Sequence, residues 1–462
     1  MRSLLVTTIL FSLWGCAAPA QLAPVPPHAV IGIEPAHLNA DYWVRRTHDS
    51  QRAVLSAEVI AVQNARLQSI DPSLHDLEKL PAQLAAGQVR DWIAKLSVRP
   101  QGVVFDERGE AVTASQLDAL DANLALDGIA PSQPTRYGLV VQRGSLRTFP
   151  TRLRVFRTDD DADIDRFQES ALFPGTPVVI AHTSRDGQWH FIVSQFYAAW
   201  IEKQYIAEGG ADAVFNYARK APYLVVTGAT ARTVFTRERP EVSELQLEMG
   251  VRIPLLSNWP AERPVNGQHP YTAHVVELPW RDRTGALQFS AALIPKTADV
   301  AGDYLTLSRA ALLAQSFKFL GERYGWGHSY NARDCSGFVS EVYRSFGVQM
   351  PRNTRDQGTS PALERITFDA DDSYDERLAI VNTLLVGDLI YIPGHVMMVI
   401  GHERGIPYVI HDTTGISYRD ADGEVRRVSL NGVSVTPLTP LLLTEDRPLI
   451  ERIYSIVLMR KR

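Results

Sequence analysis

Cysteine is scarce in this sequence, and its scarcity excludes a fold held together by several disulfide bonds. The 462 residues include two cysteines, Cys16 and Cys335. There are 47 basic and 52 acidic residues, and the net charge of −5 gives no electrostatic reason to expect a nucleic acid partner. Because the chain also lacks paired cysteines and a His-Glu-x-x-His motif, we expect neither a metal site nor a cofactor.

Long apolar runs are also missing, apart from one at the N-terminus. The run Leu4–Trp14 is too short for a permanent membrane helix, so residues 1–16 are predicted to be an export signal. Its end, Leu13-Trp14-Gly15-Cys16, resembles the lipobox of bacterial lipoproteins, which predicts a lipid on Cys16 and a periplasmic protein anchored to a bacterial membrane. The tryptophan departs from that pattern, and Ala18-Pro19-Ala20 offers a competing cleavage site that would release the protein without Cys16.

Beyond the signal, changes in composition divide the chain into a helical part and strand-rich parts. Residues 17–28 are rich in Ala and Pro and are predicted to be an extended linker. In residues 29–130, apolar side chains recur at helical spacing, which predicts a mainly helical N-terminal domain, and a Pro-containing stretch at 130–134 marks its end. The recurring sets are Leu55, Val59 and Val62, with Ile60 and Leu67 nearby, and Val89, Trp92, Ile93 and Leu96.

Two strand-rich segments resemble each other and predict two small β-barrels, at residues 135–207 and 222–298. The matching strands are Tyr137–Val141 and Gly175–Ile180 in the first segment, and Tyr223–Val226 and Gly250–Leu255 in the second. In the first segment a further strand alternates, and the residues of one face are Trp189, Phe191 and Val193. These features resemble bacterial SH3-like domains, which accompany cell-wall hydrolases.

A candidate nucleophile lies in the last third of the chain, residues 303–462. Asp334-Cys335-Ser336 is followed by apolar residues at helical spacing, so Cys335 is predicted to begin a helix. The partial positive charge of a helix N-terminus favours a thiolate, so we expect the pKa of this thiol to be lowered. An unpaired thiol in an exported protein is a liability unless its reactivity is used, and a buried, inert thiol is the competing interpretation.

A thiol nucleophile needs a proton acceptor, and the side chain whose basicity lies near neutral pH is histidine. Pro393-Gly394 is predicted to be a turn, and His395 to open the strand that follows it. The next strand is predicted to end on His411, which adjacent pairing would place beside His395. Cys335, His395 and His411 would then be nucleophile, base and orienting group, as in papain-like enzymes. Alternatively, each histidine only satisfies a neighbouring hydrogen bond.

Several motifs of residues 303–462 together resemble the NlpC family of cell-wall cysteine peptidases. They are Tyr324-Gly325-Trp326-Gly327, Asp334-Cys335-Ser336-Gly337-Phe338, Pro351-Arg352-Asn353-Thr354, Gly387-Asp388, Gly394-His395-Val396 and His411. The helical region and the two barrels resemble a multidomain branch of that family, with an N-terminal stabilising domain and two SH3-like domains. This resemblance implies an α+β fold that ends in a papain-like domain. The sequence departs from the family at His328, where many relatives have glycine.

The resemblance also implies a function and a set of functional residues. Members of that branch cleave the bond between γ-D-glutamate and an L-diamino acid in peptidoglycan stem peptides, and a free N-terminal L-alanine would be preferred. Cys335, His395 and His411 would be catalytic. The residues implied in substrate binding are Asp334, Ser336, Tyr324 and Thr354, with Glu169 and Tyr197 from the first barrel. We expect a monomer whose partners are peptidoglycan or its muropeptides, with the membrane as a further contact if Cys16 is lipidated.

Structural interpretations compete with these assignments. In these interpretations Asp334 and Ser336 only cap a helix, Tyr324 is a core aromatic residue, and Glu169 and Tyr197 are structural residues of the first barrel. Two other functions also stay open: a thiol enzyme that cleaves a different amide, such as the bond between muramic acid and L-alanine, and a non-catalytic wall-binding lipoprotein.

Overall fold

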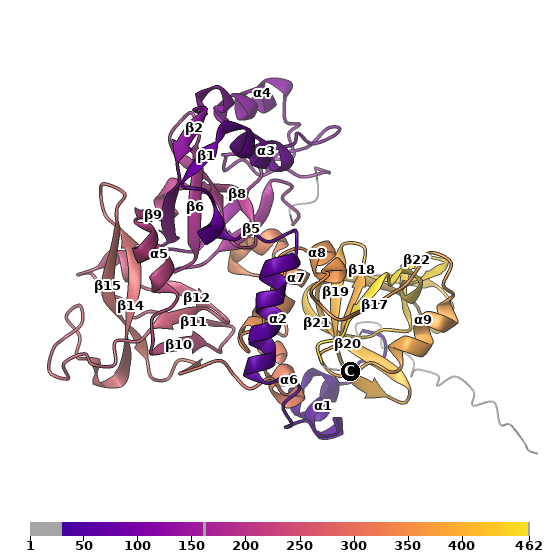
Figure 1. Ribbon diagram of the computed structural model, residues 1–462. Helices are drawn as coiled ribbons and strands as arrows, with labels where there is room; N and C mark the ends of the chain where they lie inside the picture. The colour runs from indigo at the N-terminus through magenta and orange to yellow at the C-terminus, as the bar shows by residue number, and fades with distance from the viewer. Residues whose placement is uncertain (1–29, 160–162, 461–462) are drawn as a thin grey trace, which may run out of the picture.

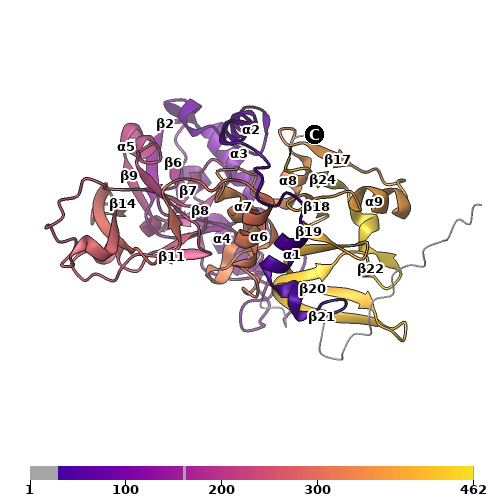
Figure 2. The same ribbon diagram turned by 90° about the horizontal axis from the view of Figure 1, so that it is seen from below.

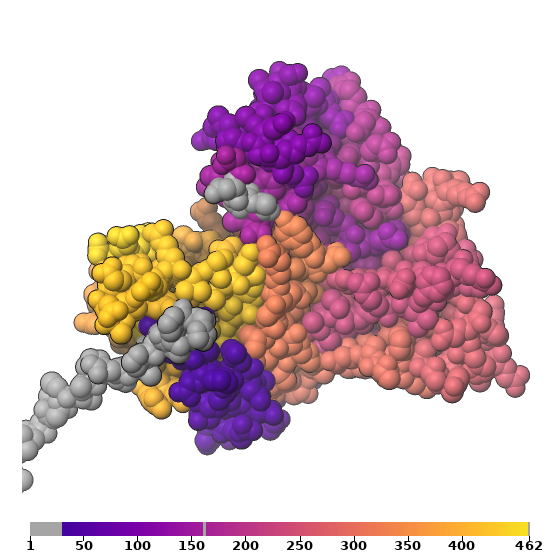
Figure 3. Space-filling model, turned by 180° about the vertical axis from the view of Figure 1, so that it is seen from behind, coloured from indigo at the N-terminus to yellow at the C-terminus, as the bar shows by residue number. Residues whose placement is uncertain are grey.

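The computed structural model of the chain describes residues 30–159 and 163–460. The predicted export signal, the linker and Cys16 lie outside these residues, so the lipid anchor stays a prediction. Within the described part of the chain, no helix is both long enough and apolar enough to cross a membrane. The structure has three lobes, formed by the first barrel with two helices, by the second barrel, and by the C-terminal domain (Figures 1 and 3).

An antiparallel sheet forms the C-terminal domain, with strand order β17-β24-β18-β19-β20-β22-β23 and β21 paired to β20. The strands are β17 (Arg365–Thr367), β18 (Leu389–Ile392), β19 (His395–Glu403), β20 (Ile406–Arg419), β21 (Val425–Pro437), β22 (Leu441–Thr444), β23 (Arg447–Pro448) and β24 (Ser455–Val457). The helices are α6 (Arg309–Phe317), α7 (Cys335–Arg344), α8 (Thr354–Thr359) and α9 (Tyr374–Val381). Seen from below, α6 and α7 lie between the barrels and this sheet (Figure 2).

Alternation along β19 separates two hydrophobic cores. Val396 and Met398 pack with Phe338 of α7, while Met397 and Val399 pack on the other face with Val381 of α9. Both faces of the central strands are therefore buried, so these strands read as continuous apolar runs rather than as alternating ones.

Local interactions determine where the helix α7 begins. The Asp334 side chain accepts a hydrogen bond from the Gly337 amide at 2.8 Å and caps the first turn. Phe338, Val339 and Val342 are fully buried on its apolar face. The helix predicted to start at Cys335 is confirmed.

A seven-stranded sheet forms the first barrel, with strand order β5-β4-β8-β7-β6-β3-β9. Its strands are β3 (Arg136–Val140), β4 (Gly144–Arg147), β5 (Gln168–Leu172), β6 (Pro177–Thr183), β7 (Trp189–Val193), β8 (Ala198–Glu202) and β9 (Ile206–Gly209). Every residue of β7 is buried, because the face with Trp189 packs under the N-terminal helices and the other face fills the barrel.

The second barrel repeats the strand pairing of the first but is divided into smaller sheets. β13 pairs antiparallel with β10, as β6 pairs with β3, which agrees with the repeat seen in the sequence. A hairpin of β14 and β15 with nine residue pairs replaces part of a closed barrel. The strands are β10 (Tyr223–Val226), β11 (Thr230–Arg232), β12 (Gln246–Glu248), β13 (Arg252–Pro254), β14 (Ala273–Arg281), β15 (Leu287–Pro295) and β16 (Val300–Ala301), after helix α5 (Ala211–Tyr217).

In the described part of the N-terminal helical region, the clustered buried side chains belong to hydrophobic cores shared with other parts of the chain. Trp43 of α1 is 1% exposed and belongs to the core of the C-terminal domain, and Asn64 of α2 bonds the Gly347 carbonyl at 2.8 Å. Val89 and Ile93 of α3 instead share a core with Trp200 of the first barrel. The region expected to be one domain is thus divided between two others. Its elements are α1 (Ala40–Arg46), α2 (Ala57–Ile70), β1 (Gln83–Ala85), α3 (Ala86–Leu96), α4 (Ala114–Asn123) and β2 (Ser132–Pro134).

Candidate active site

Cys335 is the first residue of α7 and is a free thiol, 5% exposed. Its Sγ lies 4.0 Å from the Gly394 carbonyl oxygen, and the backbone N–H of Val396 also bonds the sulfur. These two backbone groups flank His395, at the turn between β18 and β19. The structure therefore places the candidate nucleophile at the turn that carries the candidate base.

The two histidines form the middle of a hydrogen-bonded series that crosses three adjacent strands. His395 Nε2 lies 2.8 Å from His411 Nδ1, and His411 Nε2 lies 3.0 Å from Thr436 Oγ1 on β21. The expectation that a strand ends on His411 is wrong, because β20 continues to Arg419 by pairing with β21. The expected side-by-side placement of the two imidazoles is nevertheless observed. Thr436 was not identified from the sequence, where a threonine in a strand carries no distinguishing signal.

The protonation states differ from those expected at a helix start. Burial, followed by the neighbouring Asp334 carboxylate, raises the pKa of the Cys335 thiol from 9.0 to about 12. A helix N-terminus stabilises an anion by at most about 2 kcal/mol, which corresponds to a pKa decrease of about 1.5, so it does not overcome this increase. Burial also lowers the pKa of His395 to about 4 and that of His411 well below 6.5. The thiol and both imidazoles are neutral at neutral pH.

Asp334, expected to meet a substrate amine, already uses its whole carboxylate inside the protein. Oδ1 accepts hydrogen bonds from the Gly337 amide, the Ser336 hydroxyl and Arg352, while Oδ2 accepts from the Gly327 amide and Arg352. Burial opposes ionisation, but Arg352 holds the pKa of Asp334 at about 2. A carboxylate offers about four acceptor sites, so none is left for a ligand.

Arg352 is the residue that joins this cluster to the first barrel. Its Nε donates to Ser170 Oγ on β5 at 2.6 Å, and its Nη2 donates to Asp334 at 2.8 Å and to His328 Nδ1 at 2.9 Å. The sequence indicated Arg352 only as part of a motif, without a contact. Its partners come from segments far apart in the chain, which sequence reasoning could not bring together.

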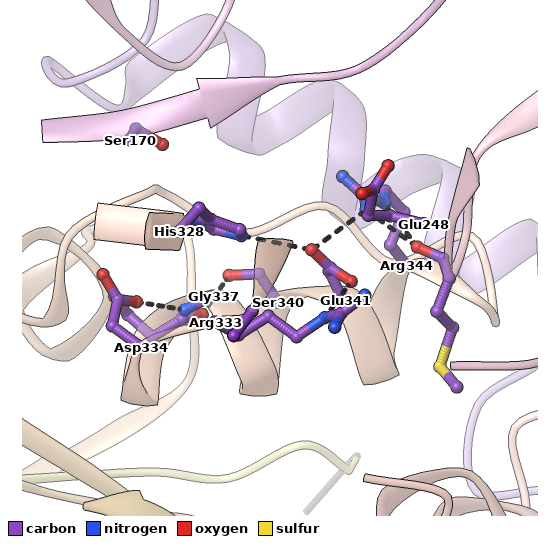
Figure 4. A network of polar contacts seen from close by, with 12 residues as sticks. Ser170, Glu248, His328, Arg333, Asp334, Gly337, Ser340, Glu341 and Arg344 are labelled. Atoms are coloured by element: carbon purple, nitrogen blue, oxygen red, sulfur yellow. Dashed lines mark hydrogen bonds and ion pairs between the residues drawn. The ribbon is translucent and has the colours of Figure 1, made fainter. Parts of the chain in front are cut away.

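A buried network of charges lies along α7 on the side of the barrels (Figure 4). Glu341 accepts from His328 Nε2 at 3.1 Å and from Arg333 Nε at 2.7 Å. Arg143, from the first barrel, donates to Glu248 of the second barrel at 2.5 Å and to the His328 carbonyl at 2.6 Å. His328, the position that departs from the family, thus connects the C-terminal domain to both barrels.

The two residues expected from the first barrel lie together. Glu169 accepts hydrogen bonds from the Thr148 hydroxyl at 2.6 Å and from the Tyr197 hydroxyl, and both Glu169 and Tyr197 are half-buried. Burial and the Glu169 carboxylate raise the pKa of Tyr197, which is also influenced by Arg352 and Asp334. Unlike Asp334, Glu169 keeps free acceptor positions beside the same cluster.

Tyr324 and Thr354 occupy different surroundings. Tyr324 is 6% exposed, and burial raises its pKa, followed by the charges of Cys335, Asp334 and Asp412. Thr354 starts α8, and its backbone carbonyl accepts from the Tyr454 hydroxyl at 3.4 Å. A cavity of about 290 Å³ between the barrels and α7 has Ser170, Tyr197, His328 and Arg352 in its wall, but not Cys335, His395, Tyr324 or Thr354.

A helix that begins at a free cysteine, packed on an antiparallel sheet with two hydrogen-bonded histidines, defines a papain-like thiol hydrolase fold. Residues 321–433 match the NlpC/P60 family, and residues 154–202 match the SH3 domain of the SH3b1 type. The C-terminal domain is therefore an NlpC/P60 domain, preceded by an SH3 domain. NlpC/P60 is a family of cysteine peptidases and peptidoglycan hydrolases.

Two solved structures that are similar to this chain are distant from it in sequence. An NlpC/P60 endopeptidase from Photobacterium damselae subsp. piscicida has 17% identity and a TM-score of 0.70, over 87% of this chain and 90% of that one. An NlpC/P60 family protein from Bacillus cereus has 19% identity and a TM-score of 0.45, over 69% of this chain and 98% of that one. None of the curated proteins matches the sequence.

Proposed function

We propose that the protein is a peptidoglycan stem-peptide endopeptidase that hydrolyses the bond between γ-D-glutamate and an L-diamino acid, with Cys335 as nucleophile. The observation that carries this proposal is the placement of the Cys335 thiol on the turn of His395, whose Nε2 lies 2.8 Å from His411. The NlpC/P60 domain and its SH3 domain give the class of reaction, and the finer choice of bond is part of the proposal.

The hydrogen-bonded series determines which nitrogen of His395 acts as the base. If His411 Nε2–H donates to Thr436, then His411 Nδ1 accepts from His395 Nε2–H, and His395 Nδ1 keeps a free lone pair. As Cys335 Sγ attacks the substrate carbonyl carbon, its proton passes to that nitrogen. His395 then gives the proton to the leaving amine as the C–N bond breaks. Water, deprotonated by His395, finally hydrolyses the thioester.

This mechanism starts from a neutral thiol and a neutral imidazole rather than from a preformed ion pair. The raised pKa of Cys335 and the lowered pKa of His395 keep the proton on sulfur until a substrate carbonyl is in place. An unpaired thiol exposed to an oxidising compartment reacts as the thiolate, so a neutral, buried thiol is also protected from oxidation.

We assign recognition of a free N-terminal amine to Glu169 rather than to Asp334. An ammonium group needs acceptor atoms. The Asp334 carboxylate has none free, whereas the Glu169 carboxylate receives two hydroxyl donors among the described residues. Asp334 instead positions Arg352 and the start of α7. Asp334, which was expected to contact the amine, therefore contributes to the site only by holding Arg352 and the start of α7 in place.

The first test is the digestion of defined muropeptides by the wild-type protein and by the variant Cys335→Ala, followed by mass spectrometry of the products. We expect cleavage after γ-D-glutamate by the wild type and at least a ~10³-fold loss in the variant. Activity retained by Cys335→Ala would contradict the thiol mechanism. Products cut between muramic acid and L-alanine would identify an amidase instead, and a chelator should leave the rate unchanged.

The second test compares stem peptides with a free and with a muramyl-blocked L-alanine. We expect Glu169→Gln to lower kcat/KM about tenfold for the free amine, because the charge-assisted hydrogen bond is lost. The same variant should cut the blocked stem as slowly as the wild type does. Thr148→Val removes one of the two hydroxyl donors to Glu169 and serves as a control, since the Glu169 side chain itself is kept. Equal cleavage of both stems by the wild type would disprove the amine contact.

A further inference from the structure

The proposed mechanism leaves one buried acid near the thiol unused. Asp412 follows His411 in β20, where the pairing with β21 is regular, so its side chain points to the opposite face from His411. That face carries Ile410 and Tyr408, which belong to the same hydrophobic core as Cys335. Asp412 therefore lies on the side of the sheet that α7 covers.

Among the described residues, Asp412 has no hydrogen-bond partner on either carboxylate oxygen, and its exposure is 0%. Four other carboxylates around α7 each have, by contrast, an arginine within 4 Å. The pairs are Glu248 with Arg143, Glu322 and Glu341 with Arg333, and Asp334 with Arg352. An isolated carboxylate without a partner is expensive to bury, so this group is stable only as a neutral acid.

The charged and titratable neighbours of Asp412 act on it in opposite directions. Burial raises its pKa most, the negative charges of Asp334 and Glu322 raise it further, and Arg333 lowers it, with a net result well above 3.8. The influence is mutual, because a negative charge on Asp412 raises the pKa of the Cys335 thiol and of Tyr324. His411, its neighbour in the strand, is neutral and does not offset this charge.

We propose that Asp412 is a positioning residue for Cys335: it carries a proton in the resting protein, and when it loses that proton its charge suppresses formation of the thiolate. The inference rests on the proposed nucleophile, Cys335. As a neutral acid, Asp412 leaves the thiol free to react with a bound substrate. As an anion at alkaline pH, it adds a second negative charge beside the sulfur, next to that of Asp334.

The structure also offers a reason to regard this acid as functional rather than as part of the packing. A buried polar group without a partner lowers stability, and its replacement by an apolar side chain of similar volume is neutral or stabilising. We therefore expect Asp412→Leu to raise the melting temperature. An unfavourable buried group beside a reactive one is expected where function, rather than stability, determines the residue.

The decisive experiment measures the sulfur itself. Alkylation of Cys335 by iodoacetamide is followed by mass spectrometry of its peptide from pH 6 to pH 11, in the wild type and in Asp412→Asn. We expect equal rates at pH 6 and, at alkaline pH, a rate about tenfold lower in the wild type, because one added negative charge raises a nearby pKa by ~1 or more. Asp388→Asn, which changes another buried acid, should behave as the wild type.

Infrared spectroscopy gives an independent reading that does not depend on activity. A protonated carboxylic acid has a carbonyl stretching band of its own, which the wild type should show at neutral pH and Asp412→Asn and Asp412→Leu should lack. A missing band, or identical alkylation profiles of the wild type and Asp412→Asn, would overturn the proposal. Neither result depends on cleavage of a peptide, so a failure of the proposed endopeptidase activity is recognised separately, with Cys335→Ala.

Discussion

Thr436 stands at the end of the hydrogen-bonded series that reaches His395. Its hydroxyl lies 3.0 Å from His411 Nε2, and His411 Nδ1 in turn lies 2.8 Å from His395 Nε2. Since both imidazoles are buried and neutral, the position of their protons is set by hydrogen bonds rather than by a carboxylate. A hydroxyl that accepts at the end of this series keeps the lone pair of His395 on Nδ1.

At the scale of single residues, we therefore expect Thr436→Val to lower kcat about tenfold with little change in KM. A positioned general base contributes ~10²–10⁴-fold to the rate of catalysis. This variant keeps the base but no longer holds it in one tautomer. Steady-state kinetics on a muropeptide measure the effect. Thr436→Ser should restore the rate, because it returns the hydroxyl, and an unchanged kcat in the valine variant would show that the series has no influence on His395.

Close packing against α7 explains why the element carrying the thiol has a glycine in its first turn. A Cβ on Gly337 would lie 2.5 Å from Cε1 of His328, well inside van der Waals contact. His328 has a φ of 64°, a left-handed value that favours glycine. The absence of a side chain at Gly337 and the left-handed backbone of His328 thus let the His328 ring lie against α7. In that position the ring accepts a hydrogen bond from Arg352.

At the scale of elements, Gly337→Ala should lower the free energy of unfolding by about 1–3 kcal/mol, because it overfills a packed contact. The same variant should lower activity by displacing His328 and therefore Arg352. Adding His328→Gly should recover part of both losses, so that the double variant is more stable than the two single changes sum to. Urea unfolding of the four proteins measures this coupling.

A matched control for that experiment is Gly87→Ala, in the first turn of α3. A Cβ there meets no atom within 4 Å, so the change should be neutral or stabilising by up to ~1 kcal/mol. Equal destabilisation at both glycines would point to the backbone rather than to the contact with His328. Strictly additive effects of Gly337→Ala and His328→Gly would also contradict the packing argument.

Helices could be predicted from the sequence where the residues that determine them are close in the chain, and not where those residues are distant. The start of α7 was predicted correctly, because its cap and its apolar face are adjacent in the sequence. In α2 the spacing of Val59 and Val62 indicated an apolar face, yet Val62 is 70% exposed while Ile60 and Leu67 are buried. Two interleaved apolar sets fit the same helical period, and only the position of α2 against the C-terminal domain selects between them.

Shared hydrophobic cores join the N-terminal helices to the C-terminal domain and to the first barrel. Trp43, near the N-terminus, packs into the core of the C-terminal domain, and α3 packs on the first barrel. The ion pair of Arg143 with Glu248 joins the two barrels, and Arg333, which pairs with Glu341 of α7, also donates to the Ala229 carbonyl of the second barrel. Removal of either partner of such a pair leaves a buried charge, which costs about 3–5 kcal/mol.

At the scale of the whole molecule, we expect mild acid to destabilise the fold, because its buried histidines resist protonation. Mainly through burial, the pKa of His190, His328 and His395 falls from 6.5 to about 4. Between these values the unfolded chain binds more protons than the folded chain, so stability is present at neutral pH and is lost as the pH falls. Each histidine should remove up to about 1.4 kcal/mol of unfolding free energy per pH unit.

Urea titrations at pH 7, 6 and 5 test this expectation. Asp412 acts in the opposite direction, since it keeps a proton that the unfolded chain releases, but three histidines outweigh it. His190→Gln removes one of the three histidines. The slope of its unfolding free energy with pH should therefore be smaller, by the amount that corresponds to about one bound proton. A free energy of unfolding that stays constant between pH 7 and pH 5 would contradict the burial of these imidazoles.

By itself, the sequence determined the features that depend on neighbouring residues: the helix that begins at Cys335, the turn before His395, the repeated strand pairing of the barrels, and the NlpC-type domain. Tertiary structure decided the features that depend on distant residues. It paired the Asp334 carboxylate with Arg352, placed the Thr436 hydroxyl within hydrogen-bond distance of His411, and kept the Cys335 thiol protonated by burying it. The reason is physical: local backbone signals act over a few residues, whereas burial and charge act through whichever groups the fold brings into contact.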